Sequence, residues 1–303
     1  MDSARAPVSR IAEFQSRSGL ADPIVTCLLC PHACRLREGG SGLCRVRRNE
    51  GGVLIPIEYG RVAAVALDPV EKKPLRHFLP GSFTFSVGYH GCNLYCPYCQ
   101  NASLSMADLS RNAKPDDVRL ASSRAMDPAA VVAAALRVGA PSISYTYNEP
   151  LVAYESVLDT AELARQAGLQ NIVVTNGYLN EQPLRRLLPY IDAMNIDLKA
   201  FDDATYQTWC GGHLQPVLDT IELCRTACHV EITTLVVTGM NDSLAVLEPA
   251  FAWLGGLDPR IPLHLSRYFP ANRYAAPPTD TGLLSRLRDA ALRHLERVYV
   301  GNI

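Results

Sequence analysis

Three cysteines stand close together in the spacing C-x3-C-x2-C. Cys92, Cys96 and Cys99 directly follow a short apolar run at residues 83–87. A [4Fe–4S] cube takes one thiolate for each iron, and a usual site supplies four thiolates. Three thiolates on one loop leave one iron open to a small chelating molecule, so this spacing predicts a cluster of that kind. The alternatives are a zinc site that His90 completes, or redox-active thiols.

A second cysteine group lies in the glycine-rich N-terminal part, with the spacing C-x2-C-x3-C-x9-C. Its members are Cys27, Cys30, Cys34 and Cys44. Four thiolates can close a tetrahedral zinc site or hold a second [4Fe–4S] cluster, and His32 is a stand-in ligand. A metal would also fold a stretch that has little apolar core. Reduced free cysteines are the alternative. Zinc is favoured over a cluster because nothing in the sequence provides an electron relay.

From about residue 59 onward, short apolar runs alternate with longer helical patterns. The predicted strands are 83–87, 142–145, 172–175, 193–198, 230–237 and 262–265, with a short last strand at 298–300. The predicted helices are 128–138, 151–167, 181–188, 216–227, 244–254 and 283–295, and Pro249 is placed to break or kink the fifth. Such alternation predicts an α/β fold with a parallel sheet, curled into a partial (β/α)6 or a full TIM-like barrel. We therefore predict a small Cys-rich metal-binding module at 1–58 and the barrel at 59–303.

In such a fold the chemistry belongs at the carboxyl ends of the strands. Besides the cysteine loop, polar pairs stand at or near the ends of four predicted strands: Asn148 and Glu149, Thr175 and Asn176, Asp197 and Lys199, His264 and Arg267. Carboxylates and carbonyls can accept hydrogen bonds from an ammonium group, and an arginine can grip a carboxylate. Each pair also has a structural interpretation: a helix start at Pro150, a plain turn, an internal salt bridge and a core histidine.

These motifs together resemble the radical S-adenosylmethionine (SAM) superfamily, in the branch similar to pyruvate formate-lyase activating enzyme. Residues from about 25 to 300 look closest to AmmeMemoRadiSam system radical SAM enzymes. The segments that carry the resemblance are 27–34, 87–101, 144–150, 175–177, 195–199 and 263–267. The resemblance covers nearly the whole chain and implies a radical SAM type of partial barrel.

The resemblance implies that Cys92, Cys96 and Cys99 hold a [4Fe–4S] cluster whose open iron chelates the methionine part of SAM. Electron transfer into the sulfonium breaks a C–S bond, and the 5′-deoxyadenosyl radical takes hydrogen from a substrate. An external donor of flavodoxin or ferredoxin type would supply the electron. The residues that would contact SAM are Tyr98, Asn148, Glu149, Thr175, Asn176, Asp197 and Lys199, with His264 and Arg267 as candidates for the adenine, a carboxylate or the substrate.

The sequence departs from the resembled families at two places. Val174 stands where pyruvate formate-lyase activating enzyme has an aspartate, which argues against that enzyme's metal-cation site. AmmeMemoRadiSam proteins usually continue into another Cys-x2-Cys segment, whereas this sequence ends at Ile303. The family's substrate is therefore not carried over. We expect a protein or peptide substrate, as for a glycyl-radical activase. A small metabolite or RNA as substrate, and a non-catalytic zinc protein, are the alternatives.

The overall composition bears on compartment and partners. Ten cysteines, seven of them in two compact groups, favour metal binding over disulfides in a chain of 303 residues. The formal net charge of −1 gives no basic field that would favour nucleic acid or an anionic membrane. No apolar run approaches the ~18 residues of a spanning helix, and residues 1–20 lack a signal-peptide core. We expect a cytoplasmic protein with no membrane partner.

Overall fold

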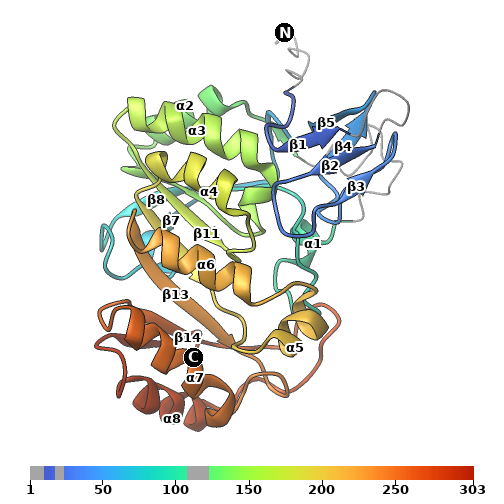
Figure 1. Cartoon of the computed structure of the whole chain (residues 1–303). Helices are drawn as coiled ribbons and strands as arrows, with labels where there is room; N and C mark the ends of the chain where they lie inside the picture. Colours follow the sequence, from blue (N-terminus) through green and yellow to red (C-terminus); the bar gives the residue numbers. More distant parts are fainter. Residues whose placement is uncertain (1–9, 18–23, 108–122) are drawn as a thin grey trace.

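The computed structural model describes residues 10–17, 24–107 and 123–303, and its centre is an eight-stranded sheet (Figure 1). The strands are, in spatial order, β15 (Val298–Gly301), β14 (Leu263–Arg267), β13 (His229–Val236), β12 (Ala193–Asp197), β11 (Gln170–Thr175), β10 (Ser142–Tyr145), β8 (Phe83–Gly88) and β7 (Ala64–Pro69). Neighbouring strands are parallel, except that β7 runs antiparallel to β8. The order has two ends, β15 and β7, so the sheet forms a partial barrel, as the sequence predicts.

Burial explains why the strands read as continuous apolar runs. All four residues of β10 are buried, because this strand lies between β8 and β11 and is covered on both faces. In the parallel register, Tyr145 lies opposite Val87 on one side and Val173 on the other. The carboxyl ends of these three strands therefore meet at one edge of the sheet.

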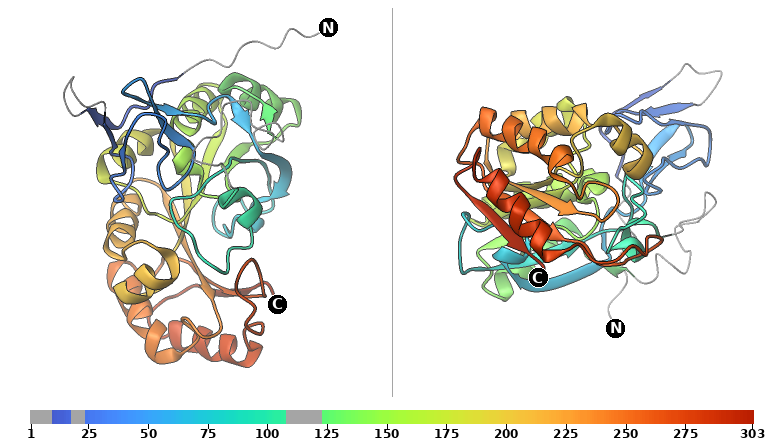
Figure 2. Two further views of the ribbon diagram at one scale, coloured as in Figure 1. Left: turned by 90° about the vertical axis from the view of Figure 1, so that its right-hand side faces the viewer. Right: turned by 90° about the horizontal axis from the view of Figure 1, so that it is seen from below.

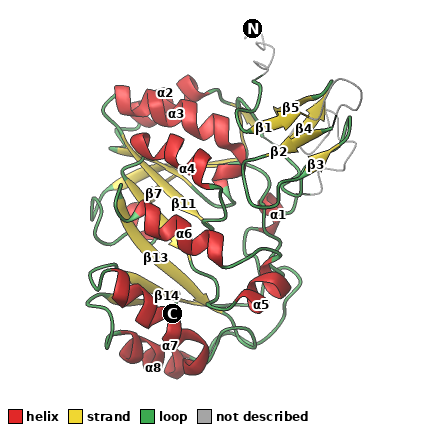
Figure 3. Cartoon of the chain, in the orientation of Figure 1, coloured by secondary structure: helices red, strands yellow, loops and turns green. Residues whose placement is uncertain are grey.

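The helices cover the outer face of the sheet (Figure 3). The longer ones are α2 (Pro128–Arg137), α3 (Tyr154–Gln166), α4 (Glu181–Leu187), α6 (Gln215–Cys224), α7 (Leu244–Leu257) and α8 (Thr281–Ala291). Three of them start at a capping side chain, since Asp127, Ser243 and Asp280 each accept a hydrogen bond from a backbone N–H of the first turn. Pro249 does not end its helix, because α7 continues from Leu244 to Leu257.

The N-terminal part forms small antiparallel sheets beside the barrel (Figure 2). They consist of β1 (Gln15–Arg17), β2 (Val25–Cys27) and β3 (Arg35–Leu36), and of β4 (Arg47–Glu50) with β5 (Val53–Pro56). A further short strand, β6 (Arg61–Val62), pairs with β9 (Arg124–Ala125), which follows the cysteine loop in the sequence. A buried bidentate ion pair joins this part to the barrel, with Arg47 Nη1 and Nη2 at 2.7 and 3.0 Å from the Glu155 carboxylate on α3. The division at residue 58 stays a prediction.

The segment between β7 and β8 packs against the sheet and was not assigned a role from the sequence. Val70 and Leu75 in this segment are buried against Ile172, which lies in β11, and Ala193, which begins β12. The sequence also missed β7, whose residues are mostly half-buried and show no clear alternation. Most of residues 1–20 lie outside the described part. Within that part, no helix is both long and apolar enough to cross a bilayer.

Candidate active site

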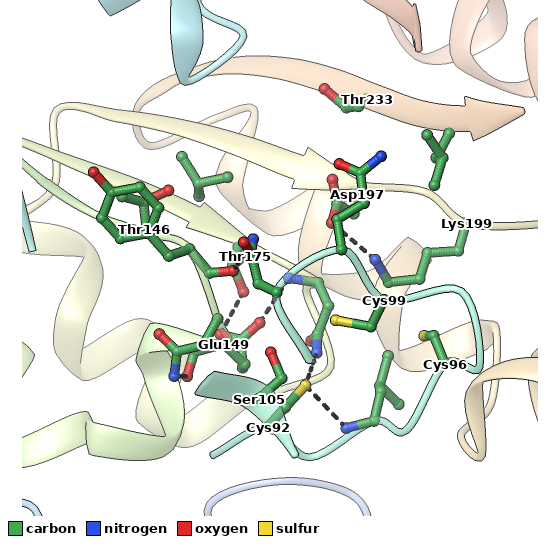
Figure 4. Close-up of a pocket in the computed structure, with 18 of the residues that line it drawn as sticks. Cys92, Cys96, Cys99, Ser105, Thr146, Glu149, Thr175, Asp197, Lys199 and Thr233 are labelled. Atoms are coloured by element: carbon green, nitrogen blue, oxygen red, sulfur yellow. Dashed lines mark hydrogen bonds and ion pairs between the residues drawn. The ribbon is translucent and has the colours of Figure 1, made fainter. Parts of the chain in front are cut away.

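A cavity of about 330 Å³ lies where the loop after β8 meets the carboxyl ends of β10 to β14 (Figure 4). Ten of the residues predicted from the sequence line it: Cys92, Cys96, Tyr98, Cys99, Asn148, Glu149, Thr175, Asn176, Asp197 and Lys199. Other polar lining residues come from the neighbouring strands β13 and β14, among them Thr233 and Ser266. The fold thus gathers side chains that are more than 100 residues apart in the sequence.

Hydrogen-bond donors and burial act in opposite directions on the thiols of the cysteine loop. The Sγ of Cys92 accepts hydrogen bonds from the backbone N–H of Leu94 at 3.3 Å and from Nδ2 of Asn176 at 3.7 Å. Burial raises the pKa of the Cys92 and Cys99 thiols above its ordinary value. A positive metal centre would therefore be needed to hold both as thiolates.

The segment after β10 holds the cysteine loop at both of its ends. Asn148 donates from Nδ2 to the carbonyl of Gly91 at 2.8 Å, just before Cys92. Asn101, just after Cys99, donates to the carbonyl of Tyr147 at 2.6 Å. The loop is therefore clamped to the end of one strand, which fixes the positions of the thiols relative to the cavity.

Glu149 is buried, and its carboxylate joins the ends of two strands. It accepts hydrogen bonds from the hydroxyl of Thr175 at 2.8 Å, the backbone N–H of Asn176 at 2.7 Å and the backbone N–H of Leu151 at 3.0 Å. Burial raises its pKa to about 7, although these donors work in the opposite direction. The Glu149 carboxylate, which the sequence predicts as a ligand for SAM, thus accepts most of its hydrogen bonds from the chain itself. These bonds fix the turn at Thr175 and Asn176, beside Cys92.

Asp197 and Lys199 form an ion pair in the cavity wall, with Nζ and Oδ2 2.8 Å apart. Burial by itself would lower the pKa of Lys199, but the Asp197 carboxylate raises it well above the ordinary value. The lysine therefore stays charged, so the wall presents one positive and one negative group next to the cysteine loop.

Tyr98, in the cysteine loop, meets a cysteine that looks isolated in the sequence. Its hydroxyl lies 3.5 Å from the Sγ of Cys210, at the end of a π-helical turn Tyr206–Cys210. Cys96 contacts the same Cys210 thiol, and that hydrogen bond is the main reason why the pKa of Cys96 is raised. Both Tyr98 and Cys210 are buried. The contact of Tyr98 with Cys210 therefore ties the cysteine loop to the turn that follows β12.

A second charged group at the cavity was not predicted. Asp68, at the end of β7, accepts hydrogen bonds from Nζ of Lys73 and from the hydroxyl of Tyr147, both at 2.8 Å. Lys73 and Tyr147 line the cavity. Burial lowers the pKa of Lys73. The sequence does show Asp68 and Lys73 close together in a short segment before the first predicted strand. Because buried charges need partners, this proximity could have indicated an ion pair.

His264 and Arg267 do not line the cavity. The buried His264 Nε2 lies 2.6 Å from the Glu231 carboxylate, and its ring stacks on Tyr299. Arg267 donates from Nε to the carbonyl of Thr279 at 2.8 Å. His264 precedes the cavity-lining Ser266 by two positions on the same strand face, so it lies deeper in the barrel. The contacts that the sequence predicts for His264 and Arg267 with SAM or substrate stay predictions.

The N-terminal cysteines also gather around one place. Cys27, Cys30, Cys34 and Cys44 line a small separate cavity together with His32. Burial is the main cause that raises the pKa of Cys30 and Cys44, each to about 12. His32 Nε2 lies 2.7 Å from the carbonyl of Asn93, so one of its nitrogens is already engaged.

His90, the alternative zinc ligand, instead pairs with Glu58 at 2.9 Å. Across residues 10–17, 24–107 and 123–303, no three His, Cys, Asp or Glu side chains converge tightly enough for a single metal ion. A cube spreads its thiolates over several irons, whereas a zinc site gathers all of them on one ion. The loop that bears Cys92, Cys96 and Cys99 offers a cluster one buried and two half-buried thiols, hydrogen-bond donors to the sulfur of Cys92, and a cavity beside them.

Comparison with known families agrees with this geometry. The profile of the family described as "Radical SAM superfamily" matches residues 86–247, from β8 into α7. An uncharacterized protein of Methanocaldococcus jannaschii, MJ0808, is 39% identical over 94% of this chain and 83% of that protein. The 7-carboxy-7-deazaguanine synthase of Thermococcus kodakarensis is 30% identical over 50% of this chain and 62% of that enzyme.

Solved structures show the same fold at low sequence identity. A radical SAM methyltransferase from Sphaerobacter thermophilus has a TM-score of 0.54 and 19% identity, over 74% of this chain and 67% of that chain. Streptococcus suis SuiB, bound to precursor peptide SuiA, has a TM-score of 0.51 and 13% identity, over 77% of this chain and 51% of that chain.

Proposed function

The chain belongs to the radical SAM superfamily, and on that premise we propose that it cleaves SAM reductively in the cavity beside Cys92, Cys96 and Cys99. These cysteines would hold the [4Fe–4S] cluster. When bound, the cluster supplies the electron that breaks a C–S bond of SAM and frees a 5′-deoxyadenosyl radical. The observation that carries the proposal is that the three thiols line the same cavity as Glu149 and the Asp197–Lys199 pair.

The chain's own residues would bind and orient SAM. Its methionine part carries an ammonium and a carboxylate, and the cavity wall offers the Asp197 carboxylate and the Lys199 ammonium as counter-charges. Glu149 acts mainly by holding Thr175 and Asn176 in place, because it accepts hydrogen bonds from both. An external one-electron donor of flavodoxin or ferredoxin type would reduce the site.

We propose a protein or peptide as the substrate, with hydrogen abstraction from one of its carbon atoms as the first step. In the part of the chain that the structure describes, no strand pairing closes the barrel between β15 and β7, so the proposal places the substrate's approach on that side. The cysteine loop and the loop after β14 touch near the cavity, where the backbone N–H of Arg273 donates to the carbonyl of Pro97 at 3.0 Å. Each loop carries one exposed aromatic side chain, Tyr95 in the first and Phe269 in the second. SuiB, a protein of the same fold, was solved with a precursor peptide bound.

A small metabolite is the second candidate substrate. The cavity volume of about 330 Å³ falls within the ~300–1,000 Å³ range of small-molecule sites. In addition, the similar enzyme of Thermococcus kodakarensis is named as a synthase of a small deazaguanine. This candidate requires the substrate to enter the cavity whole rather than to present a loop at its mouth.

Deuterium transfer distinguishes the two substrates. The reduced protein is incubated with SAM and with deuterated candidate proteins encoded by neighbouring genes, and 5′-deoxyadenosine is analysed by mass spectrometry. We expect deuterium to appear in 5′-deoxyadenosine with a protein substrate and not with the Cys92→Ala variant. Transfer from a small molecule alone would contradict the proposed substrate class.

A further inference from the structure

The cavity formed by the four N-terminal cysteines carries an inference of its own. All four thiols line it, although Cys27 and Cys44 are 17 positions apart in the chain. A Cβ atom added at Gly42 would lie 3.7 Å from the sulfurs of both Cys34 and Cys44. The glycine therefore leaves room beside two of the thiols, and the small sheets β1–β3 and β4–β5 hold the cysteines around one point.

Four thiols around one cavity are a ligand set for a metal centre, either one zinc ion or an iron–sulfur cluster. The groups that lie beside the cavity distinguish between the two.

A buried arginine at the cavity has a donor left over. Arg47 lines the cavity, its side chain is 1% exposed, and its two Nη atoms bind Glu155. Its Nε–H has no acceptor among the described residues. A buried donor without an acceptor costs about 1–3 kcal/mol. An anionic centre with sulfide and thiolate sulfurs would supply the acceptor and a counter-charge.

One wall of this cavity is formed by the cysteine loop that bears Cys92, Cys96 and Cys99. Asn93 lines it, and Asn93 is the residue that follows Cys92. On the other side of Cys92, Gly91 has φ +88°, and a Cβ there would lie 2.5 Å from the carbonyl oxygen of Cys44. Only a glycine can let the two loops approach this closely. A metal centre on the N-terminal cysteines would thus be an immediate neighbour of one on Cys92.

We propose that Cys27, Cys30, Cys34 and Cys44 bind a second [4Fe–4S] cluster, adjacent to the first. The sequence alone favours zinc because it shows no partner for electron exchange. The shared wall with the Cys92 loop provides such a partner, and the free Arg47 donor fits an anionic metal centre. The inference does not depend on SAM cleavage, since it concerns ligands outside that cavity.

The test removes the three thiols of the cysteine loop and measures the iron and zinc that remain bound. A Cys92→Ala/Cys96→Ala/Cys99→Ala protein is reconstituted anaerobically with iron and sulfide, and iron and zinc are measured by mass spectrometry. We expect about four irons per chain and no zinc in this variant, against about eight irons in the unaltered protein. One zinc without iron in the variant would overturn the proposal, and so would a metal-free variant that is folded by circular dichroism.

A second measurement needs no variant and covers the case in which the triple variant does not fold. The unaltered protein is reduced fully and examined by electron paramagnetic resonance. Two adjacent paramagnetic clusters are expected to give a spectrum broadened by spin–spin coupling. About four irons with one zinc in the unaltered protein, or an uncoupled spectrum from a protein with about eight irons, would contradict a second cluster adjacent to the first. Four irons in both proteins would instead leave the second cluster standing and refute the cluster on Cys92, Cys96 and Cys99.

Discussion

Asn148 donates a hydrogen bond from its side-chain amide to the carbonyl of Gly91 at 2.8 Å, which ties the end of β10 to the start of the cysteine loop. Replacing Asn148 by Ala removes this clamp. Loss of a part-buried hydrogen bond costs about 1 kcal/mol, roughly a fivefold change in an equilibrium. We expect cluster assembly to persist, with about fivefold faster loss of iron to a chelator.

The rate of bleaching near ~400 nm measures this loss. Asn302→Ala is the matched control, because Asn302 also donates an amide hydrogen bond to a carbonyl, that of Arg267, but at an exposed place. Equal bleaching rates for the two variants would show that the clamp does not hold the loop.

Glu149→Gln tests whether the carboxylate organises the turn beside Cys92. The amide keeps the size of the side chain but turns one acceptor into a donor, so it faces the backbone N–H of Asn176 or the hydroxyl of Thr175 with the wrong group. We expect SAM affinity to fall about tenfold or more while the iron content is unchanged. Calorimetry of SAM binding measures the affinity, and Glu162→Gln on α3 is the control. Unaltered SAM affinity would remove Glu149 from the binding account.

Asp197→Asn separates SAM binding from cluster assembly. The substitution leaves the Lys199 ammonium without the carboxylate that lies 2.8 Å away. We expect a tenfold or larger increase in the KM for SAM, with normal absorbance of the cluster. The exposed Asp219, which accepts from Gln215 on the outer helix α6, provides the control variant Asp219→Asn. A loss of iron together with the loss of binding would point to a structural role instead.

Glu231→Gln is expected to show a pH-dependent effect on stability. Burial would raise the pKa of Glu231, but hydrogen bonds from His229, His264 and the backbone N–H groups of Arg76 and His77 lower it to about 2. The unfolded chain takes up this proton near the ordinary value of 4.5, so the carboxylate stabilises the fold above that pH. The stabilisation, about 3 kcal/mol, is lost as the pH falls from about 4.5 to 2.

Urea unfolding at several pH values measures the difference between Glu231→Gln and the unaltered protein. The difference should be present at pH 7 and shrink below pH 4.5. Glu248→Gln is the control, because the exposed pair of Glu248 with Arg293 contributes less than about 1 kcal/mol. A difference that is constant down to pH 3 would contradict the assigned pKa.

Much of the fold follows from the sequence because the barrel strands are buried on both faces. The run at 142–145 is β10 residue for residue, since every side chain there is apolar or small and buried. β7 escaped prediction because its residues lie at the edge of the sheet and are half-buried. Edge position is a property of the whole sheet, so no local pattern records it.

The candidate site was predictable where it follows strand ends, and less so where distant segments meet. The Asp197–Lys199 pair follows a buried strand, and the position of both residues was evident. The contact of Tyr98 with Cys210 joins residues 112 positions apart and depends on a turn whose placement only the fold provides. Glu149 looked like a ligand residue, but its position between two strand ends gives it donors from the chain itself.

The most direct test of the central claim is the release of 5′-deoxyadenosine from SAM. The anaerobically reconstituted protein is reduced in the presence of SAM, and the product is quantified by mass spectrometry for Cys92→Ala, Cys96→Ala and Cys99→Ala. Cys228→Ala, which changes a half-buried cysteine outside the cavity, is the matched control. We predict release by the unaltered protein and by Cys228→Ala, and none by the three loop variants. Full release by Cys96→Ala, or none by the unaltered protein with its cluster assembled, would contradict the account.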